Sequence, residues 1–386
     1  MPVDRHAHQR IAAIDGLRGV SVLGVLGFHL APNGVVRGGY LGVSVFFALS
    51  GFLITRNLVA ESQRRHAVDL ARFWSRRIRR LSPAAFFVVI ACWIAHKSGL
   101  QWVVFDFGRQ AFAAAIGASN WQTIHDIRQI GFLGTLGPFG AMWSLAIEEQ
   151  FYVVAALLCW ACARSKYFVT ILTVALGVTV MWSAFAVAIF GRHLGDYYRT
   201  DLRAGEIALG GLYAVWSTRA SRSAAESGAG STVGSRLLVN GGLAGIVALF
   251  VTVRRDYWLL QPVVLLIAAT LGVVIVHGLL GASSSELLAK GGTHGGLLAS
   301  RPVQFVGLIS YSLYLVHWPI IQAVTPARLG LGMGATQAVC AGTSIVVAWL
   351  VYRFVEAPLR RSHGPARNVF AMWAACLIVM LGLFAI

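Results

Sequence analysis

The first strongly apolar stretch of the chain, residues 11–30, carries three titratable side chains, Asp15, Arg18 and His29. A charged side chain inside a membrane costs a few kcal/mol at the least, so such residues usually face a cavity or a partner. Arg18 and His29 are eleven positions apart, which on an α-helix is three turns plus about 20°, or about 16 Å along the axis. One helix would therefore present a cation and an imidazole on the same face.

Two adjacent carboxylates, Glu148 and Glu149, lie in a later apolar stretch, residues 141–163. Carboxylates at this depth are costly unless they meet a partner or serve a function. Because adjacent helix positions diverge by about 100°, we expect one to meet an imidazole or an arginine and the other to bind a neighbouring helix.

A second histidine, His317, lies in the apolar stretch 303–323. When the stretches are traced across a membrane in turn, His29, His317 and the two glutamates fall at a similar depth. A lone histidine in a membrane is often a packing residue, whereas a histidine held by a carboxylate is a general-base arrangement. The set therefore indicates general-base chemistry.

A cluster of arginines precedes the apolar stretch 82–100. Such clusters commonly bind anionic lipid head groups. Arg76 and Arg80 are spaced i, i+4 and share a helix face with guanidinium groups that suit phosphate oxygens. Together with Arg77 they are candidates for holding a phosphate-rich cytoplasmic ligand such as a coenzyme A.

Three further polar residues are weaker candidates. Ser50 fits a site-lining role as well as close helix packing. Asp201 and Arg203 are candidates for lining a substrate path, although Arg203 and Glu206 at i, i+3 can simply neutralise each other at the outer interface.

Composition indicates the class of protein to which these residues belong. The chain has 386 residues, of which 57% are hydrophobic and 12% charged, and its mean hydropathy is +0.69. Soluble domains carry about 25% charged residues, so this is a polytopic membrane protein. The net charge of +17 would suit nucleic acid, but the basic residues cluster between apolar spans, as the positive-inside rule expects. We expect no nucleic-acid partner.

Apolar windows of about 20 residues predict an all-α bundle of 10–11 transmembrane helices, with the N-terminus cytoplasmic because the inner segments then hold most Lys and Arg. We expect the outer segment 101–140 to have little regular structure and 218–235 to be a flexible linker. All five cysteines fall within predicted spans. This argues against both a disulfide framework and a metal site, so we expect no metal. The predicted spans are 11–30, 40–58, 82–100, 141–163, 167–190, 202–217, 236–253, 258–280, 303–323, 332–354 and 366–386.

The stretch from Asp15 to Gly19, followed by His29, resembles the signature of the acyltransferase family 3 integral membrane proteins, in which an arginine and a histidine separated by ten residues mark the first span. Gly205 departs from the pattern, since the family usually has Asp there. Other matches follow in the family's order over nearly the whole chain: GVSVFFALSGFLIT (42–55), RRIRRLSP (76–83), WSLAIEEQFY (143–152), YSLYLVHWP (311–319) and VEAPLR (355–360).

The resemblance implies transfer of an acyl group, most often acetyl, from cytoplasmic acyl-CoA to a hydroxyl of a sugar-containing acceptor. Such acceptors include cell-envelope glycans, glycolipids and macrolide antibiotics. It also implies a cell-membrane protein with ten core spans. Residues 1–356 would form the acyltransferase domain, and 357–386 would be a tail with an extra span.

Both arguments lead to one mechanistic hypothesis. Coenzyme phosphates bind the arginine cluster, and the acyl-bearing arm reaches between the helices past Arg18 and Ser50. His29, oriented by Glu148 or Glu149, removes the proton of the acceptor hydroxyl or takes the acyl group itself. Arg18 holds the coenzyme or stabilises developing negative charge.

Two other classes of protein stay open at this point. A proton-coupled transporter or flippase would also explain buried titratable groups, but not the arginine cluster, and the chain shows no inverted repeat. A membrane scaffold for glycan assembly would use the same groups only for packing.

Overall fold

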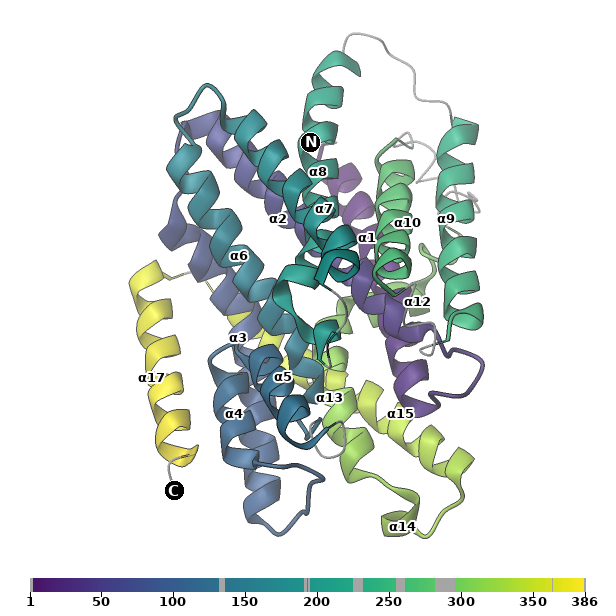
Figure 1. Cartoon of the computed structure of the whole chain (residues 1–386). Coiled ribbons are helices and arrows are strands. Elements are labelled where there is room, and N and C mark those ends of the chain that lie inside the picture. Colours follow the sequence, from purple (N-terminus) through teal and green to yellow (C-terminus); the bar gives the residue numbers. More distant parts are fainter. Residues whose placement is uncertain are drawn as a thin grey trace. The chain divides into compact units, whose positions relative to one another are not determined.

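The computed structural model describes residues 3–131, 136–190, 193, 195–224, 232–254, 261–281, 296–362 and 364–384 (Figure 1). Within these ranges every regular element is a helix, which confirms the predicted all-α class. Nine of the described helices are long and apolar enough to cross a membrane. They are α1 (Val3–Leu30), α2 (Gly42–Arg65), α3 (Leu70–Lys97), α6 (Trp143–Cys162), α7 (Phe168–Phe190), α9 (Thr232–Thr252), α10 (Gln261–Gly281), α15 (Met333–Val351) and α17 (Ala366–Phe384).

The two other predicted spans are also helical. The span predicted at 303–323 is broken at Ile309 into α12 (Arg301–Leu308) and α13 (Ser310–Ala323), and counting this pair as one span brings the total to ten. The span predicted at 202–217 lies in α8 (Thr200–Ala224), which carries three charged side chains in its first two turns and is not among the nine.

Short helices complete the described chain. They include a π-helical turn, η5, between α15 and α16, of a kind often found at functional sites. The short elements are η1 (Gly39–Leu41), α4 (Phe107–Ala115), α5 (Ser119–Ile130), η2 (Gly140–Met142), η3 (Asp196–Tyr198), α14 (Pro326–Leu329), η5 (Tyr352–Glu356) and α16 (Ala357–Arg361).

The segment 101–140 is more ordered than predicted, because α4 and α5 lie within it. The Asp106 side chain accepts a hydrogen bond from the backbone N–H of Arg109, and so caps α4. Gly131, Gly134 and Gly137, which favour a loop, all follow Ile130, where α5 ends. Of the linker predicted at 218–235, residues 225–231 lie outside the described part, and α8 and α9 extend into its two ends.

The chain divides into two compact units, which we describe separately. The first comprises Met1–Glu61, Ser165–Val187 and Ala204–Ser310, and the second comprises Ser62–Arg164, Ala188–Arg203 and Tyr311–Ile386.

In the first unit α1 packs directly on α12. A Cβ built at Gly16 would lie 2.1 Å from the carbonyl oxygen of Leu298, and one at Gly307 would lie 1.8 Å from that of Asp15. Side chains at these positions would force the backbones apart, so glycine permits the close approach that is common between membrane helices. The glycines of the stretch from Asp15 to Gly19 thus have a packing role.

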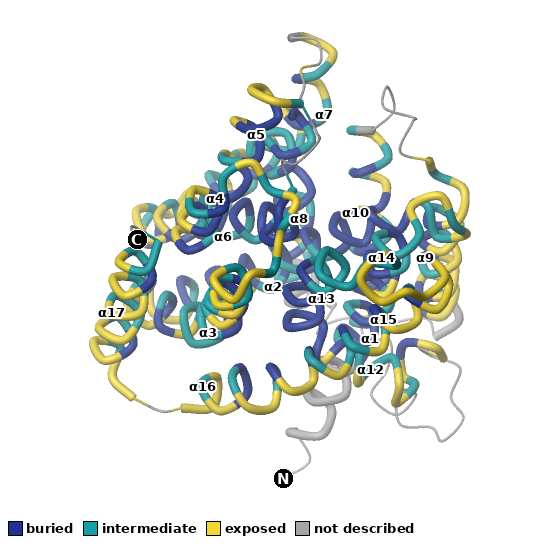
Figure 2. Tube along the Cα trace, turned by 90° about the horizontal axis from the view of Figure 1, so that it is seen from below, coloured by how far each residue is buried: buried dark blue, intermediate teal, exposed yellow. Residues whose placement is uncertain are grey.

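In the second unit α3 packs against α6, α17, η5 and α16, and α5 packs against α6. α17 lies beside α3 and α4 (Figure 1). It is largely exposed, as Figure 2 shows, but Val369 and Met380 are buried.

Candidate active site

Arg18 and His29 lie on the single helix α1, as the sequence predicts. Arg18 Nη1 is 3.6 Å from Asp15 Oδ1, and the two side chains are only 16% and 27% exposed. His29 is half-buried in the last turn of α1, and its ring meets the ring of Phe28 edge-on at a centroid distance of 5.2 Å. Ser50 is half-buried on α2. The first unit therefore holds three of the predicted site residues.

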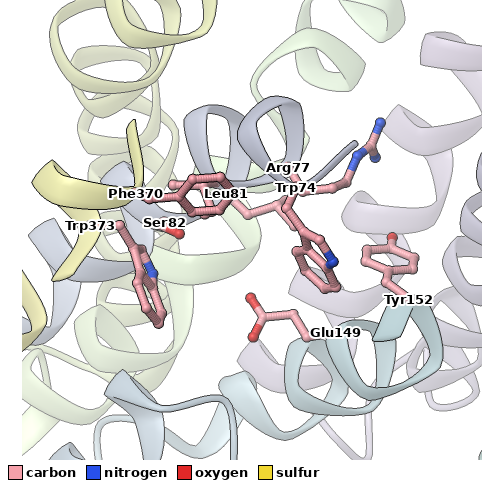
Figure 3. Close-up of a pocket in the computed structure, with 9 residues that line it drawn as sticks. Trp74, Arg77, Leu81, Ser82, Glu149, Tyr152, Phe370 and Trp373 are labelled. Atoms are coloured by element: carbon pink, nitrogen blue, oxygen red, sulfur yellow. The ribbon is translucent and has the colours of Figure 1, made fainter. Parts of the chain in front are cut away.

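The carboxylates Glu148 and Glu149 belong to the second unit and differ in their surroundings. The Tyr152 hydroxyl, one turn later on α6, donates a hydrogen bond of 3.1 Å to Glu148 Oε2. Glu149 points elsewhere, as expected for a neighbouring helix position, and its carboxylate borders a cavity (Figure 3). One oxygen also lies close to Gly117, where a built Cβ would be 2.5 Å from Glu149 Oε2.

The cavity has a volume of about 230 Å³ and lies among α3, α6 and α17. Its wall is mostly aromatic and aliphatic, with few polar groups, which is the usual character of a small-molecule site. Figure 3 shows the Glu149 carboxylate between the indole rings of Trp74 and Trp373. The cavity is lined by Trp74, Arg77, Ile78, Leu81, Ser82, Glu149, Tyr152, Phe370 and Trp373.

The arginine cluster lies on α3 itself, which begins twelve residues before the predicted span, and its members differ in environment. The Arg77 side chain is half-buried, with its guanidinium carbon 6.0 Å from the centroid of the Tyr152 ring. Arg79 Nη2 donates a hydrogen bond to the carbonyl of Gly364, just before α17. Arg76 is exposed and Arg80 is half-buried. Arg79 therefore anchors the segment before α17, a role that the spacing of the arginines does not reveal.

His317 is completely buried on α13. Its Nδ1 lies 2.7 Å from the carbonyl oxygen of Tyr314 and 3.1 Å from that of Leu313. Carbonyl oxygens only accept, so Nδ1 carries a proton and donates to them. The Tyr314 hydroxyl in turn lies 2.7 Å from the Ser144 hydroxyl.

Asp201 and Arg203 have separate environments. Asp201 forms a bidentate ion pair with Arg199, at 2.7 and 3.0 Å, and these contacts raise the pKa of Arg199. Arg203 is 1% exposed. Its guanidinium carbon lies 5.0 Å from the ring centroid of Trp143 and 4.5 Å from that of Tyr197, a cation–π arrangement.

The sequence argument missed a polar network beside the carboxylates. Gln150 Nε2 donates to Asn120 Oδ1 at 2.9 Å, and the Thr200 hydroxyl donates to Gln150 Oε1. Asn120, fully buried, donates to the carbonyl of Tyr198. The network joins α5, α6 and the start of α8. In the sequence, the polar amide of Gln150 within an apolar stretch is the one signal that could have pointed to it.

The structure thus brings together Arg77, Glu148 and Glu149 around Tyr152. Arg203 and His317 contact other aromatic residues of the same unit, and Asp201 pairs with Arg199. Arg18, His29 and Ser50 belong to the first unit.

A family model described as an acyltransferase domain matches residues 11–353. Similar proteins include the peptidoglycan O-acetyltransferase OatA of Listeria monocytogenes, 29% identical over 93% of this chain and 57% of its own length. The putative peptidoglycan O-acetyltransferase YrhL of Bacillus subtilis is 31% identical over 92% of this chain and 55% of its own.

The O-acetyltransferase OatA of Staphylococcus aureus is 30% identical over 91% of this chain and 57% of its own length. The chain therefore spans a little over half the length of these curated relatives. No solved structure matches it significantly. Because the family model covers most of the chain, the resemblance is confirmed, and this multi-pass membrane protein belongs to acyltransferase family 3.

Proposed function

We propose that this protein is a membrane O-acetyltransferase that moves an acetyl group from acyl-CoA to a hydroxyl of a cell-envelope glycan. The observation that carries the proposal is the pair of carboxylates on α6, one held by Tyr152 and the other bordering a cavity, in a chain of an acyltransferase family. Since similar proteins are named as peptidoglycan O-acetyltransferases, the acceptor we propose is a peptidoglycan sugar.

The proposed donor is acetyl-CoA on the cytoplasmic side, with its phosphates on Arg76, Arg77 and Arg80. Support comes from α3, where Arg76 is exposed and Arg80 lies one turn further along the same helix. Guanidinium groups so spaced bind phosphate oxygens through charge-assisted hydrogen bonds. Ser50 lines the path of the acyl arm in this proposal, and Arg18 stabilises the charge that develops on the thioester oxygen or the departing sulfur.

His29 is the proposed catalytic base. It takes the proton of the acceptor hydroxyl as the oxygen bonds to the thioester carbon, the carbon–sulfur bond breaks, and the coenzyme thiolate leaves. In the alternative course, His29 first takes the acetyl group itself and then passes it to the hydroxyl. Glu148 or Glu149 orients the imidazole, while His317, Asp201 and Arg203 line the acceptor path.

The proposal also fixes an orientation. The N-terminus is cytoplasmic, and the protein lies in the cell membrane. Residues 1–356 form the acyltransferase domain, and 357–386 form a tail that includes α17.

Binding of coenzyme A tests the donor assignment. Arg76→Ala combined with Arg80→Ala removes two phosphate ligands, each worth about 1.5–3 kcal/mol as a charged hydrogen-bond donor. We expect the Kd for coenzyme A, measured with purified protein in nanodiscs, to rise at least tenfold. Arg361→Ala, which removes an exposed charge at the end of α16, is the control and should leave the Kd unchanged. An unchanged Kd in the double variant would contradict this donor site.

A further inference from the structure

In the described part of the chain, no side chain or backbone N–H donates a hydrogen bond to the Glu149 carboxylate, whereas its neighbour Glu148 is bound by Tyr152. A carboxylate in apolar surroundings is costly unless its oxygens accept hydrogen bonds. The cavity that it borders is therefore suited to a ligand that brings donors.

Aromatic rings stand on both sides of this carboxylate. Trp74 comes from α3 and Trp373 from α17, with Phe370 beside them (Figure 3). The C–H bonds on one face of a sugar ring carry partial positive charge, so this face packs against the electron-rich face of an aromatic ring. The hydroxyls around the sugar ring can donate to a carboxylate. Two indoles flanking one carboxylate match this combination of surfaces.

The other polar atoms fit a ligand with hydroxyl groups. Ser82 and Arg77 also line the cavity, and Arg77 Nε is buried without an acceptor among the described residues. A sugar hydroxyl both donates and accepts, so one ring can donate to Glu149 and also bind the Ser82 hydroxyl, which lines the same cavity.

The size of the cavity suits a sugar ring. Its volume of about 230 Å³ gives room for a single six-membered sugar, and the cavity is open on one side, so the rest of a longer glycan can extend out of it.

One wall of the cavity comes from outside the segment that the family model covers. Phe370 and Trp373 lie on α17, and the match ends at residue 353. α17 is held in place by the hydrogen bond from Arg79 to Gly364 and by Val369, which is buried. The wall is thus anchored to α3, which supplies the opposite wall through Trp74.

We infer that this cavity is the subsite for one N-acetylhexosamine ring of the acceptor, and that Trp373 and Phe370 determine which sugars it takes. The inference rests on the proposed function, because it assigns the acceptor of that reaction. It adds α17 to the machinery that recognises substrate.

The test separates acceptor from donor. Acetyl transfer is measured with acetyl-CoA and a peptidoglycan-derived glycan, each varied in turn, for Trp373→Ala and Trp373→Phe. We expect Trp373→Ala to raise the acceptor KM at least tenfold with the donor KM unchanged, and Trp373→Phe to raise it less because an aromatic face remains. Ile378→Ala, which removes a side chain of α17 that is 68% exposed, is the matched control and should behave like the wild type.

Direct binding keeps failure of the inference distinct from failure of the proposed function. Saturation-transfer NMR with methyl N-acetylglucosaminide, without donor, should give a signal with the wild type and Ile378→Ala and lose it with Trp373→Ala. Sugar binding without any acetyl transfer by the wild type would contradict the proposed function and leave the subsite standing. Transfer with an unchanged acceptor KM in Trp373→Ala, or a rise in the donor KM instead, would overturn the subsite.

Discussion

The Tyr152 hydroxyl donates a hydrogen bond of 3.1 Å to Oε2 of Glu148, one turn earlier on α6. The same tyrosine ring lies 6.0 Å from the guanidinium carbon of Arg77, so one side chain contacts both a carboxylate and the arginine cluster. Glu149, the next residue, borders the cavity instead. Two adjacent carboxylates in different environments can carry different tasks, as in enzymes whose acid and base are set apart by their surroundings.

Tyr152→Phe should lower kcat about tenfold and change the donor KM little. It removes one hydrogen bond to a charged group, worth about 1.5–3 kcal/mol, and 1.4 kcal/mol corresponds to a factor of ten in rate. Steady-state acetyl transfer measures this effect. Tyr167→Phe, at an exposed position before α7, controls for the loss of a tyrosine hydroxyl. If Tyr152→Phe keeps the kcat of the wild type, the hydrogen bond from Tyr152 to Glu148 has no role in transfer.

Gly117→Ala should be more harmful than Gly330→Ala, although both glycines have a positive φ, 72° and 65°. An alanine in the left-handed region costs about 1–2 kcal/mol. At Gly117 the new Cβ would also lie 2.5 Å from Glu149 Oε2, whereas nothing lies within 4 Å of one at Gly330.

Thermal unfolding in detergent together with transfer assays compares these two variants. We expect both to lower the unfolding midpoint modestly, and only Gly117→Ala to reduce transfer, because it displaces the carboxylate. Equal activities of the two variants would show that the position of Glu149 is unimportant.

Arg203→Lys should destabilise the protein by about 1–2 kcal/mol. Arg203 is buried between the rings of Trp143 and Tyr197, and a planar guanidinium stacks on such rings where an ammonium group cannot. The unfolding midpoint in detergent measures the loss, with the exposed Arg301→Lys as the neutral control. If the two variants unfold at the same temperature, the stacking contributes nothing.

Much of the fold follows from the sequence, because a run of about 20 apolar residues has few alternatives to a membrane helix. α4 and α5 were not predicted because they are too short and too amphipathic to form an apolar run. The only local signal for α4 is Asp106, which caps its first turn. The break at Ile309 has no Pro, and Gly307 two residues earlier is a weak signal in a chain that has many glycines within its helices.

The candidate site could be predicted only in part. Placing a titratable side chain in a membrane span costs free energy, so Glu148, Glu149 and His317 are identified from the sequence without any structure. Trp373, by contrast, is one of twelve tryptophans in a hydrophobic chain, and it joins Glu149 only because α17 packs beside α3. The same holds for Arg79, whose partner Gly364 is 285 residues away.

The central claim is that His29 carries the acetyl transfer, and one comparison tests it most directly. Wild type, His29→Ala and His125→Ala, which replaces an exposed histidine of α5, are purified in nanodiscs and supplied with labelled acetyl-CoA and peptidoglycan fragments. We predict label on the glycan with the wild type and His125→Ala and none with His29→Ala, while all three bind coenzyme A alike. Transfer by His29→Ala at the wild-type rate would contradict the account.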